Sequence, residues 1–319
     1  MSEIIAWTQW SDLKVPAGVK LLSQNNYPLE SSDLSKINFF VPSYMGGATA
    51  LAFAGKMENL KVLQMPNAGY DDALAYVRPG LTLCNAAGVH DASTAELAVT
   101  LALASRRGIP DFVRDQLNEK WNHQRRTSLS DSKIGVVGFG SIGKQVAKNL
   151  AGFEVEVVGF SRSGKDGAKK IEELDTYLPT LDIVILILPL NKESKHLFNR
   201  DRLAKMKDGA LLVNVARGPI VETDALVAEL NTGRIYAALD VTDPEPLPAG
   251  HPLWKAKNCL IVPHVGGNST AFEPRCRKLI ESQLELMAAG KPLKNVVADR
   301  KSTRLNSSHI PLSRMPSSA

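Results

Sequence analysis

The sequence predicts an α/β protein with parallel sheets in two domains, and three observations point to this class. The chain has 319 residues, more than one typical core holds, which favours two domains. From residue 133 onward, short apolar runs alternate with helical patterns, as expected for strands joined by crossover helices. One run, DIVILILPL at 182–190, is apolar at every residue after Asp182 and therefore suits a strand that is buried on both faces.

The expected strands are apolar runs that stop in turn residues, and the expected helices fill most of the intervals. Ser93 and Glu96 have the spacing of a capping box at the start of the first helix. Apolar residues cover nearly every face of that helix, so we expect it to be buried. The second helix is amphipathic and is a candidate arm or interface element. The strands are expected at 37–44, 60–67, 81–88, 133–140, 154–161, 182–190, 210–216, 235–241 and 259–264, and the helices at 93–107, 109–123, 141–153 and 272–290.

Composition excludes several classes of function. The formal net charge is +5, but Lys301, Arg304 and Arg314 near the C-terminus contribute +3 of it, which leaves +2 for the rest of the chain. No basic stripe interleaved with aromatic residues is present, so nucleic-acid binding is not expected. The three cysteines have no CxxC spacing and are expected to be small buried side chains, and no metal site is predicted.

The start of the chain does not predict a signal peptide. The first ten residues, MSEIIAWTQW, lack the basic and long apolar regions of a signal peptide. No run approaches the roughly 18 apolar residues of a membrane span, so no membrane partner is expected and the protein is expected to be cytoplasmic. Residues 300–319 are serine-rich and have no period, so we expect a disordered tail, which resembles non-native read-through from a vector or adapter.

A glycine-rich loop predicts a dinucleotide site. Gly138, Gly140 and Gly143 form a G-x-G-x-x-G pattern that follows a buried strand and begins a helix. The first glycine permits a tight turn, the second lets the backbone approach a pyrophosphate, and the third allows close packing of helix and strand. The N–H groups at the start of the helix can then bind the anion. Ser141 and Ile142 lie within this loop and join the predicted site.

The end of the following strand bears on the choice between NAD and NADP. An NAD site usually places an acidic residue there, where it accepts the ribose 2′-OH. Here the end reads Ser161, Arg162 and Ser163, whereas Glu156 lies near the beginning of the strand. Hydroxyl groups and a guanidinium suit a 2′-phosphate, because arginine supplies a fork of donors. The sequence therefore predicts that NADP(H) is preferred over NAD(H).

Three ionisable residues follow apolar runs in the last third of the chain. They are Arg217 in NVARGP, Glu245 in TDPEPLP and His264 in VPHVGG. An arginine can bind the carboxylate of an acid substrate through charge-assisted, bidentate bonds. A histidine can pass a proton to a carbonyl oxygen, and a nearby carboxylate favours the imidazolium and fixes its orientation. Alone, this set predicts an acid substrate and a proton transfer; together with the glycine-rich loop, it predicts hydride transfer to a keto acid.

In their order, GFGSIG, ILPLNKES, NVARGPIVE, LDVTDPEPLP and VPHVGG resemble the D-isomer-specific 2-hydroxyacid dehydrogenase family, which includes glyoxylate/hydroxypyruvate reductases and phosphoglycerate dehydrogenases. The resemblance runs from about residue 38 to 297. It implies two Rossmann-like, doubly wound parallel-sheet domains with the active-site cleft between them. The substrate domain is expected to be discontinuous, at 1–103 and 268–299, with the dinucleotide domain at 104–267. Members are commonly homodimers, so a homodimer is expected.

The resemblance also implies roles for single residues. Arg217 would grip the substrate carboxylate and polarise the keto group, His264 would be the general acid and base, and Glu245 its partner. Asp240 resembles the residue that holds the nicotinamide carboxamide, and Ala68 and Gly69 resemble a loop whose N–H groups bind the substrate carboxylate. Tyr44, Met45 and Gly46 occupy a plausible specificity loop. The remaining expected cofactor residues are Leu188, Pro189, Val215, Ala216 and Gly266.

These observations predict NADP-dependent, reversible reduction of a small 2-keto acid to a D-2-hydroxy acid. Two alternatives stay open at this point. One is an NAD enzyme of the phosphoglycerate dehydrogenase type, and the other is a non-catalytic, dinucleotide-sensing binding protein like the corepressors that share this fold. The complete Arg–Glu–His set favours an enzyme.

Overall fold

The structure, a computed structural model, describes residues 3–299 of the chain. The expected tail at 300–319 therefore lies outside the described residues. The chain divides into two compact units, Met1–His90 with Thr270–Ala319 (unit 1) and Asp91–Ser269 (unit 2). Among the described residues, no helix is long and apolar enough to cross a membrane.

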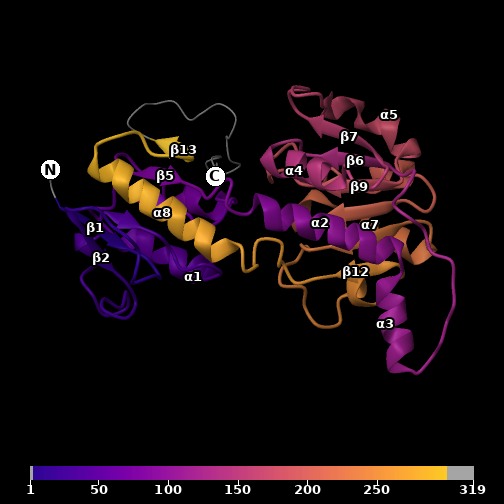
Figure 1. Ribbon diagram of the computed structural model, residues 1–319, viewed down its shortest axis with the longest axis horizontal. Coiled ribbons are helices and arrows are strands. Elements are labelled where there is room, and N and C mark those ends of the chain that lie inside the picture. The colour runs from indigo at the N-terminus through magenta and orange to yellow at the C-terminus, as the bar shows by residue number, and fades with distance from the viewer. Residues whose placement is uncertain (1–2, 300–319) are drawn as a thin grey trace, which may run out of the picture. The chain divides into compact units, whose positions relative to one another are not determined.

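Unit 1 is built on a six-stranded sheet in the order β13-β5-β4-β3-β1-β2. Figure 1 labels β1, β2, β5 and β13 among its strands. All neighbouring strands are parallel except β13, which runs antiparallel to β5. The strands are β1 (Ile4–Trp7), β2 (Val19–Leu22), β3 (Phe39–Phe40), β4 (Val62–Gln64), β5 (Thr82–Cys84) and β13 (Val296–Asp299); the α-helices are α1 (Gly47–Ala52) and α8 (Phe272–Ala288), with short 3-10 helices η1 (Leu34–Lys36), η2 (Phe53–Lys56) and η3 (Asp71–Tyr76).

Successive residues of these strands belong to opposite cores, because side chains alternate across a strand. Phe40 packs into one apolar cluster and Phe39 into the other. Helix α8 covers the face that contains Phe39, and it does so with residues spaced four apart, namely Phe272, Cys276, Ile280 and Leu284. This spacing places the four side chains on one stripe of the helix.

Unit 2 is built on a seven-stranded sheet in the order β12-β11-β10-β9-β6-β7-β8, with all neighbours parallel. This is the order of a doubly wound fold with one added strand, and it turns around at the pair β6 and β9. The elements are α2 (Asp91–Arg106), α3 (Ile109–Leu117), β6 (Lys133–Val137), α4 (Ser141–Leu150), β7 (Glu156–Ser161), β8 (Lys169–Lys170), η4 (Ile171–Glu173), α5 (Leu174–Tyr177), η5 (Leu178–Thr180), β9 (Ile183–Leu186), α6 (Arg200–Lys205), β10 (Leu211–Asn214), η6 (Gly218–Ile220), α7 (Thr223–Thr232), β11 (Tyr236–Leu239), η7 (Pro252–Lys255) and β12 (Cys259–Ile261).

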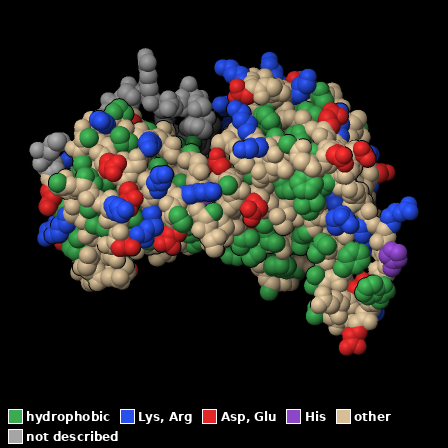
Figure 2. All heavy atoms as spheres, viewed as in Figure 1, with side chains coloured by type: hydrophobic (Ala, Val, Ile, Leu, Met, Phe, Trp, Pro, Cys, Tyr) green, Lys and Arg blue, Asp and Glu red, His purple; other side chains and the backbone are tan. Residues whose placement is uncertain are grey.

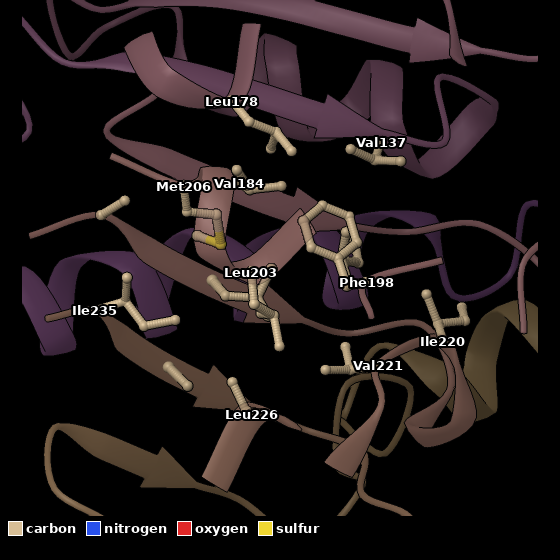
Figure 3. Packing of buried hydrophobic residues seen from close by; sticks show 14 of the residues in the cluster. Val137, Leu178, Val184, Phe198, Leu203, Met206, Ile220, Val221, Leu226 and Ile235 are labelled. Carbon is tan, nitrogen blue, oxygen red and sulfur yellow. The ribbon is translucent and has the colours of Figure 1, made fainter. Parts of the chain in front are cut away.

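The two faces of this sheet carry separate cores, as expected for parallel strands that are buried on both sides. In β9, Ile183 and Ile185 pack with α2 and α4, whereas Val184 and Leu186 pack with α5, α6 and α7. Figure 3 shows the second of these cores, where Phe198 lies among aliphatic side chains of the strands and helices. The predicted α/β class with parallel sheets is confirmed.

Several local predictions differ from the structure. Helix α2 begins at Asp91, so the capping box predicted at Ser93 and Glu96 is wrong; Ser93 is a buried residue inside the helix. Helix α3 ends at Leu117, well before residue 123, because the backbone leaves the helical region at Asn118 and turns to a positive φ at Glu119. The domain boundary expected at residues 103 and 104 falls inside α2, all of which lies in unit 2, where it packs on α4.

The cysteines are inert in character. Cys84 and Cys276 are buried, and Cys259 is partly buried. Burial raises the pKa of each thiol to about 12. These side chains therefore remain protonated at neutral pH and serve as small apolar groups, as the sequence indicates.

Candidate functional site

The glycine-rich loop lies where the strand order of unit 2 turns around. Gly138 follows β6 and has a φ of 103°, which favours glycine. A Cβ on Gly138 would stand 2.2 Å from the carbonyl oxygen of Ile187 behind β9, and a Cβ on Gly143 would stand 2.1 Å from the carbonyl oxygen of Gly138. Nothing lies within 4 Å of a Cβ on Gly140, which caps the N-terminus of α4. The loop thus leaves open space before the N–H groups of a helix, and this cradle fits a pyrophosphate.

The end of β7 presents the residues predicted to select the cofactor. Ser161 is the last residue of the strand, and its hydroxyl accepts a bond from the Gly164 N–H at 3.1 Å. Arg162 follows with 60% of its side chain exposed, and its Nη1 lies 3.9 Å from Glu193 Oε2. Glu156 begins the strand and forms an ion pair with Lys133 at 3.0 Å, at the opposite end. The Glu156 carboxylate therefore lies at the opposite end of β7 from the residues that are expected to contact the ribose.

The ends of β9 and β10 carry the remaining expected cofactor residues of the sheet. Leu188 and Pro189 follow β9, and the Pro189 carbonyl accepts a bond from Ser194 Oγ at 2.8 Å. Val215 and Ala216 follow β10 and are buried. These segments end beside the glycine-rich loop, because β6 and β9 are hydrogen-bonded neighbours and β10 is the next strand.

His264 and Glu245 form a direct pair. His264 Nδ1 lies 2.5 Å from Glu245 Oε1, and both side chains are partly exposed. A carboxylate only accepts hydrogen bonds, so Nδ1 carries the hydrogen and Nε2 is left as the ring nitrogen that can exchange a proton with a substrate. His264 has a φ of 51°, and its N–H donates to the Asp240 carbonyl at 2.8 Å.

Arg217 lies directly after β10, and a buried side chain holds its backbone. Asn214 Nδ2 donates to the Arg217 carbonyl at 3.0 Å, and Asn214 Oδ1 accepts from the Ala216 N–H at 3.1 Å. The guanidinium donates to the Ala216 carbonyl at 2.8 Å. Its positive charge also helps to lower the pKa of Glu245, so Arg217 belongs to the same charged cluster as the Glu–His pair.

The loop that bears Glu245 is fixed by short polar contacts. Thr242 Oγ1 donates to the Pro244 carbonyl at 2.9 Å, and Thr223 Oγ1 donates to the Asp243 carbonyl at 2.8 Å. Gly218 packs against the same loop so closely that a Cβ there would stand 1.9 Å from the Thr242 carbonyl oxygen. The segment after Arg217 and the segment before Glu245 are therefore held together.

Asp240 supports the segment that follows His264. Its Oδ1 accepts from the Val265 N–H at 2.6 Å and its Oδ2 from the Gly266 N–H at 3.0 Å. Burial raises the pKa of Asp240, although these two N–H groups oppose the shift. Both oxygens of Asp240 thus already accept backbone bonds, and the Gly266 N–H is already donated to Asp240. The structure gives both residues a role in shaping the histidine loop that the sequence alone did not show.

The electrostatics of Glu245 favour the ionised carboxylate. Burial works against ionisation, but the hydrogen bond and charge of His264, the nearby Thr242 N–H and the charge of Arg217 outweigh it. The pKa of Glu245 is therefore held below its usual 4.5. The ionised Glu245 accepts the hydrogen bond from His264 Nδ1 and so keeps the ring oriented.

The substrate-side residues predicted from the resemblance lie in unit 1. Ala68 and Gly69 form the turn between β4 and η3, and no described residue accepts a bond from their N–H groups. Tyr44 stacks on Phe272 with ring centroids 3.7 Å apart, and Met45 has a φ of 60° and is 59% exposed. Gly46 caps α1.

Sequence reasoning missed two supporting residues, Asn214 in unit 2 and Asn85 in unit 1. Asn85 Nδ2 donates to the Ala68 carbonyl at 2.7 Å. Asn214 ends the strand LLVN, and Asn85 directly follows the strand TLC. A buried polar residue in such a place must satisfy its hydrogen bonds locally, and this is the signal that could have found them.

Comparisons with known proteins agree with the motifs. Residues 99–266 match the profile described as D-isomer specific 2-hydroxyacid dehydrogenase, NAD binding domain. Glyoxylate reductase of Thermofilum pendens is 36% identical over 73% of this chain and 73% of its own length. D-3-phosphoglycerate dehydrogenase of Archaeoglobus fulgidus is 33% identical over 75% of this chain but only 47% of its own length.

A solved structure extends the likeness to nearly the whole chain. The D-isomer specific 2-hydroxyacid dehydrogenase from Xanthobacter autotrophicus Py2, solved with NADPH and MES, is 28% identical and superposes with a TM-score of 0.75. The match covers 94% of this chain and 99% of that one. The resemblance drawn from the motifs is confirmed, and the chain belongs to the NAD(P)-dependent D-isomer specific 2-hydroxyacid dehydrogenase family.

Proposed function

We propose that this protein reduces a small 2-keto acid to the D-2-hydroxy acid, reversibly and with NADPH as the preferred cofactor. One observation carries the proposal. The 2.5 Å pair of His264 and Glu245 lies in one charged cluster with Arg217, in the unit that also holds the glycine-rich loop. A protein that only bound a dinucleotide would have no use for this set of residues.

The proton transfer follows from the geometry of the pair. His264 in its protonated form carries hydrogens on both ring nitrogens. Glu245 holds Nδ1, so Nε2 donates its proton to the keto oxygen as negative charge develops there. When bound, the reduced nicotinamide supplies the hydride for the keto carbon. The neutral imidazole that remains is still held by Glu245 and accepts the proton back in the oxidative direction.

Binding of the acid is assigned to two kinds of donor. Arg217 can form charge-assisted, bidentate bonds to the substrate carboxylate, and its positive charge also polarises the adjacent keto group. The N–H groups of Ala68 and Gly69 in unit 1 would also bind a carboxylate. Asn214 keeps the Arg217 backbone in place through its bond to the carbonyl.

The preference for NADPH rests on the end of β7. Ser161, Arg162 and Ser163 offer two hydroxyls and a guanidinium, and the acidic residue of that strand, Glu156, is paired with Lys133 at the other end. The relative from Xanthobacter autotrophicus Py2 was solved with NADPH. The glycines before α4 would hold the pyrophosphate, with Leu188, Pro189, Val215, Ala216, Asp240 and Gly266 lining the remainder of the cofactor site.

One assay tests the proposal directly. Oxidation of NADPH and of NADH is measured against glyoxylate, hydroxypyruvate, pyruvate, phenylpyruvate and branched 2-keto acids. We expect turnover with at least one small keto acid and a higher kcat/KM with NADPH. Equal or better use of NADH would overturn the cofactor assignment.

The same assay separates the alternatives. The relative from Archaeoglobus fulgidus favours a phosphoglycerate dehydrogenase-type activity, which would appear as NAD-dependent oxidation of 3-phosphoglycerate. Tight binding of NADPH without turnover of any keto acid would favour the non-catalytic, sensing role.

A homodimer is also part of this proposal, and an exposed apolar stripe supports it. Ile109, Val113 and Leu117 lie four residues apart on α3 and are 49%, 50% and 79% exposed, and Trp121 is 98% exposed. Figure 2 shows apolar side chains at the surface in this part of the chain. Sedimentation velocity checks the dimer; a monomer at micromolar concentration would contradict it.

A further inference from the structure

The turn that carries Ala68 and Gly69 has its carbonyl groups tied down one after another. Four consecutive carbonyls accept hydrogen bonds, and three of the four donors are side chains. Such a run leaves the turn with a single available orientation. The bonds are Gln64 Nε2 to the Met65 carbonyl at 2.8 Å, His90 Nε2 to that of Pro66 at 3.0 Å, the Ala86 N–H to that of Asn67 at 2.8 Å, and Asn85 Nδ2 to that of Ala68 at 2.7 Å.

The N–H groups of the same turn behave differently. Within residues 3–299, nothing accepts a bond from the N–H of Asn67, Ala68 or Gly69. The carbonyl oxygens of this turn therefore accept hydrogen bonds from the protein, whereas its N–H groups have no acceptor among the described residues. Successive free N–H groups form the kind of concavity that binds anions.

A buried network of amides lies behind this arrangement. Gln64 and Gln283 are both fully buried, and Gln283 Nε2 donates to Gln64 Oε1 at 2.7 Å. Gln64 Nε2 also donates to the Asn85 carbonyl at 3.0 Å. Gln283 Oε1 accepts from the Lys294 N–H at 2.8 Å. Each amide has its donors and acceptor satisfied, which fixes the network in one arrangement.

His90 is held as firmly as Asn85. Its side chain is only 5% exposed and its ring is nearly parallel to that of Phe272, with centroids 5.2 Å apart. A carbonyl only accepts, so Nε2 carries the hydrogen in its bond to Pro66. This hydrogen bond gives the buried His90 a structural role in unit 1, separate from the Glu245–His264 pair of unit 2.

From this geometry we propose that Asn85 and His90 are positioning residues for the substrate carboxylate. Asn85 and His90 hold the carbonyls of Ala68 and Pro66. The N–H groups of the turn can then face the anion, while the carbonyl oxygens point away from it. The proposal rests on the proposed function, because it assigns the carboxylate to this turn. Without Asn85 Nδ2, the Ala68 carbonyl loses its donor, and rotation of that peptide would present an oxygen to a negatively charged group.

The decisive experiment compares two asparagines of unit 1. Asn85→Ala removes the bond to Ala68. Asn38→Ala is the matched control, since Asn38 also bonds two backbone groups, donating to the Glu3 carbonyl and accepting from the Ile5 N–H, each at 3.0 Å, before β3 begins. The readouts are KM and kcat with the best keto acid of the panel, inhibition by oxalate, and the Kd of NADPH, with thermal unfolding to compare stability.

We expect Asn85→Ala to raise the KM for the keto acid and the inhibition constant of oxalate by about tenfold, the effect of losing one hydrogen bond that orients an anion site. The kcat should change less than about twofold and the Kd of NADPH should not change. Asn38→Ala should leave all four values near those of the unaltered protein. Equal changes in the two variants, or a loss of kcat at unchanged KM, would overturn the proposal.

A second pair keeps the test decisive if Asn85→Ala does not fold. His90→Ala should raise KM in the same manner, and His90→Gln, whose amide can still donate to Pro66, should recover part of the loss. No recovery, or no change in KM in a folded His90→Ala, would count against the assignment. Failure of the proposed function is distinguishable, because then the unaltered protein itself would reduce no keto acid.

Discussion

Two turns in this molecule present free backbone N–H groups at the carboxyl ends of parallel strands, and they achieve it by different means. In unit 2, Gly138, Gly140 and Gly143 allow the backbone to bend and leave open space before α4. In unit 1, no glycine pattern is needed. There, side chains of Gln64, Asn85 and His90 tie down the carbonyls of the turn.

The difference illustrates two physical routes to the anion sites that we propose. The first uses local conformation: absent side chains and a helix N-terminus suffice, so the determinants lie within a few residues. The second uses hydrogen bonds from distant parts of the chain, such as the link from Gln283 of α8 to Gln64 of β4. Each turn should therefore fail through different substitutions and affect a different ligand.

The largest effect is expected at His264, which we assign to chemistry and not to either turn. His264→Ala removes the proton donor and should lower kcat by roughly 10²–10⁴-fold. The Kd of NADPH, measured by fluorescence titration, should stay nearly unchanged. Near-normal turnover in this variant would refute the role of His264.

The next effect sharpens the contrast between the turns. Gly140→Ala should raise the KM for NADPH by roughly tenfold, because the added methyl group fills the space before α4 while nothing within 4 Å opposes it in the fold. The KM for the keto acid should change little, the reverse of the pattern expected for Asn85→Ala. Gly152→Ala is the control, since its Cβ also meets nothing within 4 Å. If Gly140→Ala raised only the KM for the keto acid, the assignment of different ligands to the two turns would be wrong.

Substitution of Arg162, at the expected edge of the cofactor site, should change the affinity for NADPH by a similar factor. Arg162→Ala should raise the Kd of NADPH by about tenfold at low salt and leave that of NADH unchanged, since only NADPH bears a 2′-phosphate. Glu193→Gln should act weakly in the opposite sense, because it removes a carboxylate that lies 3.9 Å from the guanidinium. Glu156→Gln, at the far end of β7, is the control. Equal losses for both cofactors would contradict the NADPH assignment.

The smallest effect concerns pH. The pKa of Glu245 lies below 4.5, so the stability that its ionised form contributes is fully present above that value and is lost as the pH falls through the lowered one. In Glu245→Gln this acid-induced loss should disappear, because the substituted side chain has no carboxylate to protonate. The free energy of unfolding, measured as a function of pH for both proteins, checks this. Profiles that coincide would argue against the pairing.

Much of the fold could be predicted from the sequence, because its determinants are local or periodic. The apolar runs that became β6, β9, β10 and β11 each bury both faces, and their lengths exclude long helices. Errors occurred at element ends, where capping competes with tertiary packing. Ser93 has the spacing of a helix cap, yet α2 extends to Asp91 and buries Ser93.

The charged cluster could be predicted in part from the sequence. Arg217, Glu245 and His264 stand out in the sequence because each follows an apolar run, and the structure brings His264 and Glu245 within 2.5 Å. The residues that hold these three segments in place could not be predicted from the sequence. Asn214 holds the Arg217 backbone and Asp240 accepts from two successive N–H groups after His264, and neither partner can be inferred from spacing.

The sequence alone was sufficient to predict the α/β class, the glycine-rich turn, the ionisable set and the family, since each depends on residue types in a short, ordered pattern. The orientation of these parts became visible only in the folded protein: which ring nitrogen of His264 remains available to a substrate, and which carbonyl groups of the turn at Ala68 accept hydrogen bonds. These depend on hydrogen bonds between residues up to 219 positions apart, such as Gln64 and Gln283. A hydrogen bond requires distance and direction together, and folding alone supplies both.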